Sequence, residues 1–567
     1  MLSNLMSKTS PLSLTELEAL QLERAKASLT AQEKLAQLLH PIFWAHWRTE
    51  TTEGVLGRVG KMPWGGGFLG TADVCDQGPL LREAQQRQKI PMLVSGDHEC
   101  GCRATRAPQC GRPMNFGAIE PIEEAEELLY RASVNVAQQA RALGCHWNFA
   151  PVVDISMNWD SPIVNHRAYG DNVERICSLS QTYIRAFQEN GMAATAKHFP
   201  GDGVDTRDQH IIVTHNTLPF DQWQATYGRT FGAAIDAGVM SIMTGWIALE
   251  GRSQCDPRTG LLLPATMDRA IQIDLLREQM GFEGVIITDA FGMGGLDSVY
   301  TNEDDLVIGA LQGGADMLLF ISSSVDSTVE VIEQALNDGR LDETQINASV
   351  DRILSMKAKL GLLSDKPSLP DEAAFDQFVN EPAAIELPHE VAERSLTLVR
   401  DWKNRYPLKA PTGSKILLID LPADEPKPFD LNVGEDRDNT QPIYLLASEL
   451  ESDGYEVTCV NGTDVVPGDT SAYEAVIYLT QACPRAKGGT IRLSADCHGR
   501  INWPAIKNGQ AAYFVSFGNP YAIREIGIID NYVCAYSRQP NMVEAYAKAL
   551  LGKIPFMGTC PVDLMLR

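Results

Sequence analysis

Short, continuously apolar runs alternate with longer amphipathic stretches along the first 363 residues. Continuous apolar character is typical of strands buried on both faces of a parallel sheet. The amphipathic stretches, such as residues 123–144, have the periodicity of helices. This βα repeat predicts a TIM-type (β/α)8-like barrel, with a doubly wound sheet as the alternative. The strand-like runs leave one barrel strand unidentified; they are GGFLG, PMLVSGD, CHWNFAPVVDI, AATAKHFPG, VMSIMTGW, GVIITDAFG and ADMLLFI.

A helix is predicted ahead of the first of these runs. Thr30 and Glu33 have the spacing of a capping box, in which each side chain bonds the other residue's backbone N–H. Leu35, Leu38 and Leu39 form an apolar stripe behind it.

The βα pattern stops near Leu363, and a chain of 567 residues is too long for one ordinary core. Residues 364–382 are rich in proline and acidic residues, which is typical of a linker. A second α/β region follows. We therefore predict a catalytic barrel over 1–364 with its N-terminal helix, a linker over 365–388 and a C-terminal domain over 389–567. Its apolar runs are KILLIDL, YEVTCV, EAVIYLT, AAYFVSFG and NYVCAYS.

Charge and composition exclude several classes of partner. A formal net charge of −25 repels nucleic acid and anionic membrane surfaces. No apolar run approaches the ~18 residues of a membrane span, and the first residues lack the pattern of a secretory signal. We therefore expect a cytoplasmic protein, where scattered cysteines stay reduced. The composition predicts no oligomeric state.

No metal or cofactor is expected. Cys100 and Cys102, beside His98 and Glu99, resemble half of a zinc site, but no second Cys/His pair at zinc spacing follows. Neither region carries the Gly-rich loop of a nucleotide site.

Polar residues follow the predicted strands. In a parallel barrel, the active site lies at the carboxyl ends of the strands. Carboxylates, cations and an aromatic face at those ends suit a polyhydroxylated neutral ligand such as a sugar. An N-terminal helix cap is the alternative role for Asp289. The strand-end residues are Asp97, Asp154, Lys197, His198, Trp246 and Asp289.

Asp208 and His210 are two positions apart, so their side chains share a face in an extended segment. A carboxylate beside an imidazole fixes its tautomer and makes it a competent general acid/base. From these residues alone, a solvated Asp-x-His turn is the simpler interpretation. His215, downstream of this pair, is expected to be structural.

The stretch KHFPGDGVDTRDQH, residues 197–210, resembles a signature of the β-N-acetylglucosaminidase branch of glycoside hydrolase family 3. That signature reads Lys-His-(Phe/Ile)-Pro-Gly-x-Gly-x₄-Asp-x-His, and every fixed position matches. FAPVVDI, NHRAYGD and ITDAFGM resemble further family motifs in the family's order. AYAKALLGKIPFMGTCPVDL resembles the closing segment of the family's second domain, so the resemblance spans nearly the whole chain and implies a smaller αβα sandwich after the barrel.

The resemblance also implies roles for individual residues. Asp289 resembles the nucleophile, His210 the general acid/base on a mobile loop, and Asp208 its orienting partner. Gly201 and Gly203 would let that loop move. The residues that resemble sugar-binding positions are Asp97, Arg167, Lys197 and His198.

The strand end GDHECGCR departs from the family's pattern. Members often carry Asp-x-Glu-Gly-Gly-Arg there, whereas this chain has Cys100 in place of a glycine, Cys102 in place of the arginine, and Arg103 one position later. Trp246 stands where a histidine is common. Its indole either stacks on a sugar face or packs in the barrel.

The resemblance implies a retaining exo-β-N-acetylglucosaminidase that acts on small saccharides with a terminal N-acetylglucosamine. A phosphorylase is an alternative, because a neutral imidazole does not repel phosphate as a carboxylate does. A β-glucosidase of the family is a second alternative, although those members lack the Asp-x-His signature. A catalytically silent sugar-binding protein is the alternative outside enzymes.

Overall fold

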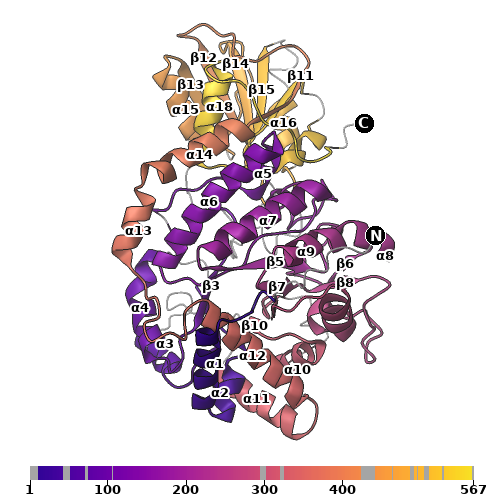
Figure 1. The fold of residues 1–567 in the computed structure, drawn as a ribbon. Coiled ribbons are helices and arrows are strands. Elements are labelled where there is room, and N and C mark those ends of the chain that lie inside the picture. Colours follow the sequence, from indigo (N-terminus) through magenta and orange to yellow (C-terminus); the bar gives the residue numbers. More distant parts are fainter. Residues whose placement is uncertain are drawn as a thin grey trace, which may run out of the picture.

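The computed structural model describes residues 10–42, 52–69, 74–104, 106–293, 300, 302–319, 325–422, 441–462, 464–484, 491–494, 496–502, 510–526 and 529–564. The N-terminal part surrounds one parallel sheet. The C-terminal part contains a second sheet that lies over α5 (Pro113–Ala118) and α6 (Ile122–Ala142) (Figure 1).

Parallel strands of the N-terminal part curl into a ring. Six of them pair in the order β2-β3-β4-β5-β7-β9, and β1 pairs with β10. Parallel bridges between Ile42 and Phe68, and between Ile287 and Met317, join these two groups. The described residues therefore form the predicted TIM-type barrel. The ring strands are β1 (Leu39–His40), β2 (Gly66–Phe68), β3 (Leu93–Gly96), β4 (Trp147–Asn148), β5 (Ala193–Phe199), β7 (Ser241–Thr244), β9 (Val285–Thr288) and β10 (Leu318–Leu319).

The strand missing from the sequence analysis is β1. The capping box of Thr30 and Glu33 is confirmed, but its helix, α2 (Ala31–Ala36), ends earlier than predicted. The prediction that Leu38 and Leu39 extend the helical stripe was wrong. Both are completely buried, and Leu39 pairs with Leu318 instead. Pairing with β10 across the closed ring overrides helix propensity at this point.

Helices surround the ring, as the amphipathic stretches predicted. Residues 123–144 fall almost wholly within α6. A second strand pair, β6 (Thr214–Asn216) and β8 (Ile247–Leu249), lies beyond the ends of β5 and β7. The other helices of this part are α1 (Glu16–Ser28), α3 (Thr52–Val59), α4 (Val74–Arg87), η1 (Asn165–Arg167), α7 (Val173–Glu189), α8 (Phe220–Ala225), α9 (Tyr227–Asp236), η2 (Ala265–Met267), η3 (Ala270–Gln279), α10 (Glu303–Gly313), α11 (Val325–Asn337) and α12 (Glu343–Lys359).

The predicted linker region is partly helical. It includes α13 (Glu372–Val379) and the start of α14 (Pro382–Ser395). Asp371 caps α13 by accepting the N–H of Ala374, and α13 packs against α6. The domain limits at 364 and 389 stay a prediction.

The second sheet has the strand order β11-β16-β15-β14-β12-β13 and is parallel except for β11. Leu417 and Ile419 face one buried cluster, whereas Ile416 and Leu418 face the other. The sheet is therefore covered on both faces, as expected of an αβα sandwich. Its elements are β11 (Thr397–Asp401), β12 (Lys415–Leu421), α15 (Pro442–Ser452), β13 (Glu456–Val460), β14 (Ala475–Thr480), α16 (Asp496–Asn502), β15 (Ala511–Ser516), η4 (Pro520–Arg524), β16 (Asn531–Cys534) and α18 (Pro540–Leu550).

The two parts share an apolar contact, since Met114 and Ala118 of α5 belong to one of the C-terminal clusters. Within the described ranges, no helix is both long enough and apolar enough to cross a membrane.

Candidate active site

The predicted site residues gather at the carboxyl edge of the barrel. Asp97 directly follows β3, Lys197 and His198 lie near the end of β5, and Asp289 directly follows β9. Arg167 comes from η1, in the long connection after β4. Because parallel strands of a barrel end on the same face, these side chains reach one region.

A buried network of alternating charges links several of them. Arg167 donates from Nε to Oε2 of Glu99 at 3.0 Å and from Nη2 to Oε1 at 2.7 Å. Lys197 Nζ lies 2.8 Å from Oδ1 of Asp97 and 2.7 Å from Oε1 of Glu99. The side chains of Glu99, Arg167 and Lys197 are only 1%, 3% and 3% exposed. Arg103 contacts Asp97 at 3.8 Å despite its shifted position.

The network stays ionised. Burial alone would raise the pKa of Glu99, but Arg167 and Lys197 hold it well below its usual range. Burial likewise opposes the charge of Lys197, yet Asp97 and Glu99 raise its pKa. The array therefore presents fixed donors and acceptors of the kind that bind sugar hydroxyls.

A second buried group surrounds His198. Its Nδ1 lies 2.7 Å from Oδ2 of Asp154, and the backbone N–H of Asp202 donates to Oδ1 of Asp154 at 2.8 Å. Burial lowers the pKa of His198 to about 3, with a further decrease caused by Arg167. Burial raises the pKa of Asp154 to about 7 and that of Asp202 to about 7, the latter with help from Asp154. The charge of Asp289 acts on the pKa of His198 in the opposite direction and raises it.

The loop between β5 and β6 holds Asp208 and His210 in contact. Oδ1 of Asp208 lies 2.8 Å from Nδ1 of His210 and accepts the backbone N–H of His210 at 2.8 Å. The Asp208 side chain is fully buried, whereas that of His210 is 12% exposed. The N–H groups of Ile211 and Ile212 donate to the carbonyl of Asp208 and complete a turn. The structure thus shows a buried carboxylate that orients a partly accessible imidazole.

Asp289 is held through its backbone. Its N–H donates to the carbonyl of Thr244 at the end of β7 at 2.8 Å, and its Oδ1 accepts the N–H of Ala290 at 2.8 Å. Its side chain is half-buried. A carboxylate fixed at a strand end in this way is suitable for in-line attack on a bound sugar.

Trp246 is buried, with 1% of its surface exposed. Its indole Nε1 donates to the carbonyl of Ala290 at 2.8 Å, and its ring packs against Phe291. These contacts correspond to the packing interpretation of Trp246, and its role as a stacking surface for sugar stays a prediction.

Gly201 and Gly203 are required for close packing around the loop. Their φ angles are +117° and +98°, in the region that favours glycine. A Cβ at Gly201 would lie 2.2 Å from the Tyr227 ring, and one at Gly203 would lie 2.2 Å from the carbonyl of Ile155. In this structure they fit the loop to its neighbours, and the predicted loop movement stays a prediction.

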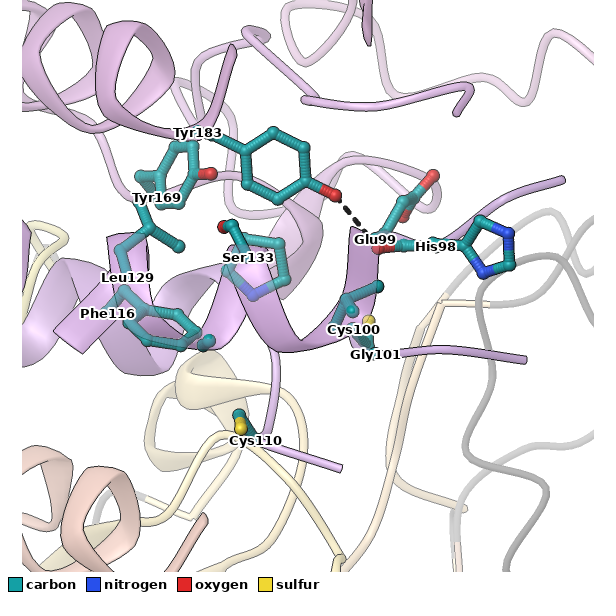
Figure 2. A pocket seen from close by; sticks show the side chains of 13 residues that line it. His98, Glu99, Cys100, Gly101, Cys110, Phe116, Leu129, Ser133, Tyr169 and Tyr183 are labelled. Atoms are coloured by element: carbon teal, nitrogen blue, oxygen red, sulfur yellow. Dashed lines mark hydrogen bonds between the residues drawn. The ribbon is translucent and has the colours of Figure 1, made fainter. Parts of the chain in front are cut away.

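The altered strand end borders a small cavity of about 20 Å³, enough for roughly one water molecule (Figure 2). Tyr183 donates from its hydroxyl to the carbonyl of His98 at 2.9 Å, and Nη1 of Arg112 lies 3.3 Å from Sγ of Cys100. Burial lowers the pKa of His98 to about 4. Among the described residues, no group of three or more His, Cys, Asp or Glu side chains is arranged to hold a metal ion.

The C-terminal part supports the connection that carries Arg167. Tyr521 and Ser156 join through their hydroxyls at 2.9 Å, and Arg492 pairs with Asp160 at 2.8 Å. The backbone N–H of Asp563 donates to Asp171 at 2.6 Å. The C-terminal part therefore braces this connection through η4 and loop residues rather than through its strands.

Sequence reasoning missed the contributions of Glu99, Asp202 and Gln209. Glu99 lies two residues after Asp97, so in an extended segment the two side chains lie on the same side of the chain. This spacing could have indicated Glu99 as a further site residue. Asp202 and Gln209 occupy variable positions of the signature, where the resemblance gave no signal. His215, predicted to be structural, lies on β6 with its side chain half-buried.

Comparison with known proteins gives a consistent result. Residues 30–356 match the Glycosyl hydrolase family 3 N terminal domain. The chain is 31% identical over 510 residues to a β-N-acetylglucosaminidase/β-glucosidase from Cellulomonas fimi, with 88% of each chain covered. It is 24% identical over 540 residues to β-hexosaminidase A from Pseudoalteromonas piscicida, with 87% of each covered.

Solved structures share the fold over nearly the whole chain. A β-glucoside phosphorylase bound to 2FGlc superimposes with a TM-score of 0.87 at 26% identity, covering 98% of both chains. A β-N-acetylglucosaminidase from Paenibacillus sp. superimposes with a TM-score of 0.77 at 24% identity, covering 95% of this chain and 100% of that one. With the matching N-terminal domain and these relatives, the protein is a glycoside hydrolase, and its chain belongs to glycoside hydrolase family 3.

Proposed function

We propose that the protein is a retaining exo-β-N-acetylglucosaminidase that releases terminal β-linked N-acetylglucosamine from small saccharides. The observation that carries the proposal is the contact between Asp208 and His210 on a loop of the barrel itself. Relatives named for activity on N-acetylglucosamine or hexosamine support this choice of sugar.

The proposed reaction is a double displacement. In the first step, an oxygen of Asp289 attacks the anomeric carbon, the glycosidic C–O bond breaks, and the leaving oxygen takes a proton from His210. In the second step, His210 takes a proton from water as the water oxygen attacks the anomeric carbon and the bond to Asp289 breaks.

Asp208 determines which nitrogen of His210 donates and accepts the proton. A carboxylate only accepts hydrogen bonds, so the 2.8 Å contact assigns a hydrogen to Nδ1 and leaves Nε2 to exchange the proton. The negative charge of Asp208 stabilises the imidazolium form. Asp97, Arg167, Lys197 and His198 are proposed to bind the sugar hydroxyls.

Phosphorolysis is the second candidate, supported by the structural match to a β-glucoside phosphorylase over 98% of both chains. Phosphate is already nucleophilic, and a neutral His210 would not repel it as a second carboxylate would. Phosphate would then replace water in the second step and give a sugar 1-phosphate.

The test is release of nitrophenol from the aryl β-N-acetylglucosaminide and the aryl β-glucoside, each with and without phosphate. The proposal predicts a strong preference for the acetamido sugar and free N-acetylglucosamine as the product in both buffers. Preference for glucose would make the protein a β-glucosidase, and a sugar 1-phosphate would make it a phosphorylase.

A further inference from the structure

Gln209 lies between Asp208 and His210, yet its side chain points into the protein rather than toward them. It is 1% exposed. Its Nε2 donates to Oδ2 of Asp202 at 3.1 Å, and its Oε1 accepts the backbone N–H of Trp246 at 3.3 Å. The amide thus uses both of its functions to hold the loop at two separate points.

The contact with Trp246 leads to the strand end that carries Asp289. The Trp246 indole donates to the carbonyl of Ala290, whose own N–H donates to Oδ1 of Asp289. A continuous series of hydrogen bonds therefore joins the His210 loop to the carboxylate of Asp289. A Cβ at Gly245 would lie 3.1 Å from Oε1 of Gln209, so a glycine at this position leaves space for the amide.

The contact with Asp202 leads to the sugar-binding side of the site. Oδ1 of Asp202 accepts the N–H of Gly203 at 2.7 Å, and the N–H of Asp202 donates to Asp154, which holds His198. Gln209 therefore connects the loop both to the group of Asp202, Asp154 and His198 and to the strand end that carries Asp289.

We propose that Gln209 is a positioning residue that fixes His210 relative to Asp289 through its paired contacts with Asp202 and Trp246. This inference rests on the proposed function. The two catalytic groups of a retaining glycosidase must stand on either side of one bond, and a misplacement of about 1 Å lowers the rate by about 10²-fold. A histidine on a loop needs such a tie more than a carboxylate on a strand does.

Glutamine is suited to this position because it both donates and accepts. Glutamate has the same shape, but at a pH well above 7, where Asp202 with its raised pKa of about 7 is ionised, two carboxylates would face each other with no hydrogen between them. Methionine has a similar length and makes neither bond. Gln209→Glu and Gln209→Met therefore remove the tie in different ways while they keep the space filled. Gln181→Glu is the matched control, since Gln181 is exposed on α7 and bonds only to the carbonyl of Ala233 among the contacts described.

The experiment measures kcat/KM for aryl β-N-acetylglucosaminides with good and poor leaving groups. We expect both Gln209 variants to lose about 10²-fold with a poor leaving group, which needs His210 as the acid, and less than about tenfold with dinitrophenol, which does not. With dinitrophenol, KM should fall together with kcat, because a slower second step makes the glycosyl-enzyme accumulate. Added azide, which needs no base, should raise kcat of the variants with dinitrophenol and yield the glycosyl azide.

An equal loss of kcat/KM with every leaving group, or no response to azide, would overturn the positioning role. General damage to the fold lowers kcat/KM for all leaving groups alike, so such a result would indicate damage rather than lost positioning. His210→Ala is measured in parallel. If His210→Ala also lacks dependence on the leaving group, the proposed function itself fails. If His210→Ala shows the dependence and the Gln209 variants do not, only this inference fails. Agreement between Gln209→Glu and Gln209→Met guards against misfolding of either one.

Discussion

Replacement of Glu99 by glutamine is the perturbation that tests the buried charge network most sharply. Glu99 binds Arg167 through both oxygens and Lys197 through Oε1, and these side chains are at most 3% exposed. Glutamine keeps the shape of the side chain. Its Oε1 can still accept a hydrogen bond, but its NH₂ group would replace Oε2 and face the donating Nε of Arg167.

The expected loss follows from those contacts. Removal of one member of a buried ion pair costs about 3–5 kcal/mol, because the remaining charge stays buried without compensation. A whole domain is stable by about 5–15 kcal/mol, so Glu99→Gln should remove about a fifth or more of that free energy. Glu127→Gln is the control, since Glu127 pairs with Arg131 at 3.9 Å and is 71% exposed. Exposed pairs contribute about 0–1 kcal/mol.

The assay is urea unfolding followed by the fluorescence of buried indoles such as Trp147 and Trp246. Because the folded pKa of Glu99 is lowered below 4.5, its contribution is fully present above that pH. It is lost as the pH falls through the folded pKa. The difference in free energy of unfolding between wild type and Glu99→Gln should therefore be constant near neutral pH and become smaller only at acidic pH. If Glu99→Gln lowered the free energy of unfolding at pH 7 by no more than Glu127→Gln does, the reasoning would be refuted.

Three further predictions concern the proposed catalytic groups and their surroundings. Asp289→Ala should abolish turnover, and retained turnover would exclude Asp289 as the nucleophile. The free energy of unfolding in urea should change by less than about 1 kcal/mol, because the Asp289 side chain is half-buried. His210→Ala should lose about 10²–10⁴-fold with poor leaving groups and far less with dinitrophenol, measured as kcat/KM; a uniform loss would contradict the acid role. Relative to wild type, Asp202→Asn should gain stability as the pH rises from about 4 to about 7. Burial raises the pKa of Asp202 to about 7, so in this range the folded wild type holds a proton that the unfolded wild type has lost, and folding must take that proton up. Urea midpoints at several pH values measure this, and a pH-independent difference would contradict it.

The sequence predicted the barrel because its strands are buried on both faces and therefore have continuous apolar runs. β1 escaped prediction because only Leu39 and His40 form it, and its pairing partner β10 lies almost 280 residues away. Local periodicity in a stretch that begins with a helix contains no information about that distant pairing. The prediction of a linker at α13 has the same cause. The surroundings of this helix are acidic and proline-rich, and its packing on α6 is not visible in the local sequence.

For the candidate site, the sequence predicted residues whose chemistry is visible in the chain. Asp208 and His210 are two apart, and Asp289 follows an apolar run, so local rules place them. Glu99 and Gln209 act through partners in other segments of the chain, Arg167 and Trp246, which only the folded barrel brings within reach. The predicted cytoplasmic location and the retaining mechanism stay predictions.

The most direct test of the account is the identity of the residue that carries the sugar. Incubation with a dinitrophenyl β-N-acetylglucosaminide whose ring fluorine slows both steps should accumulate the glycosyl-enzyme, especially in His210→Ala, where the second step lacks its base. Peptide mass mapping should then find one added sugar on the segment that contains Asp289, and none on the same segment of Asp289→Ala. A sugar attached elsewhere, or release of product with inverted anomeric configuration and no adduct, would contradict the double displacement on Asp289.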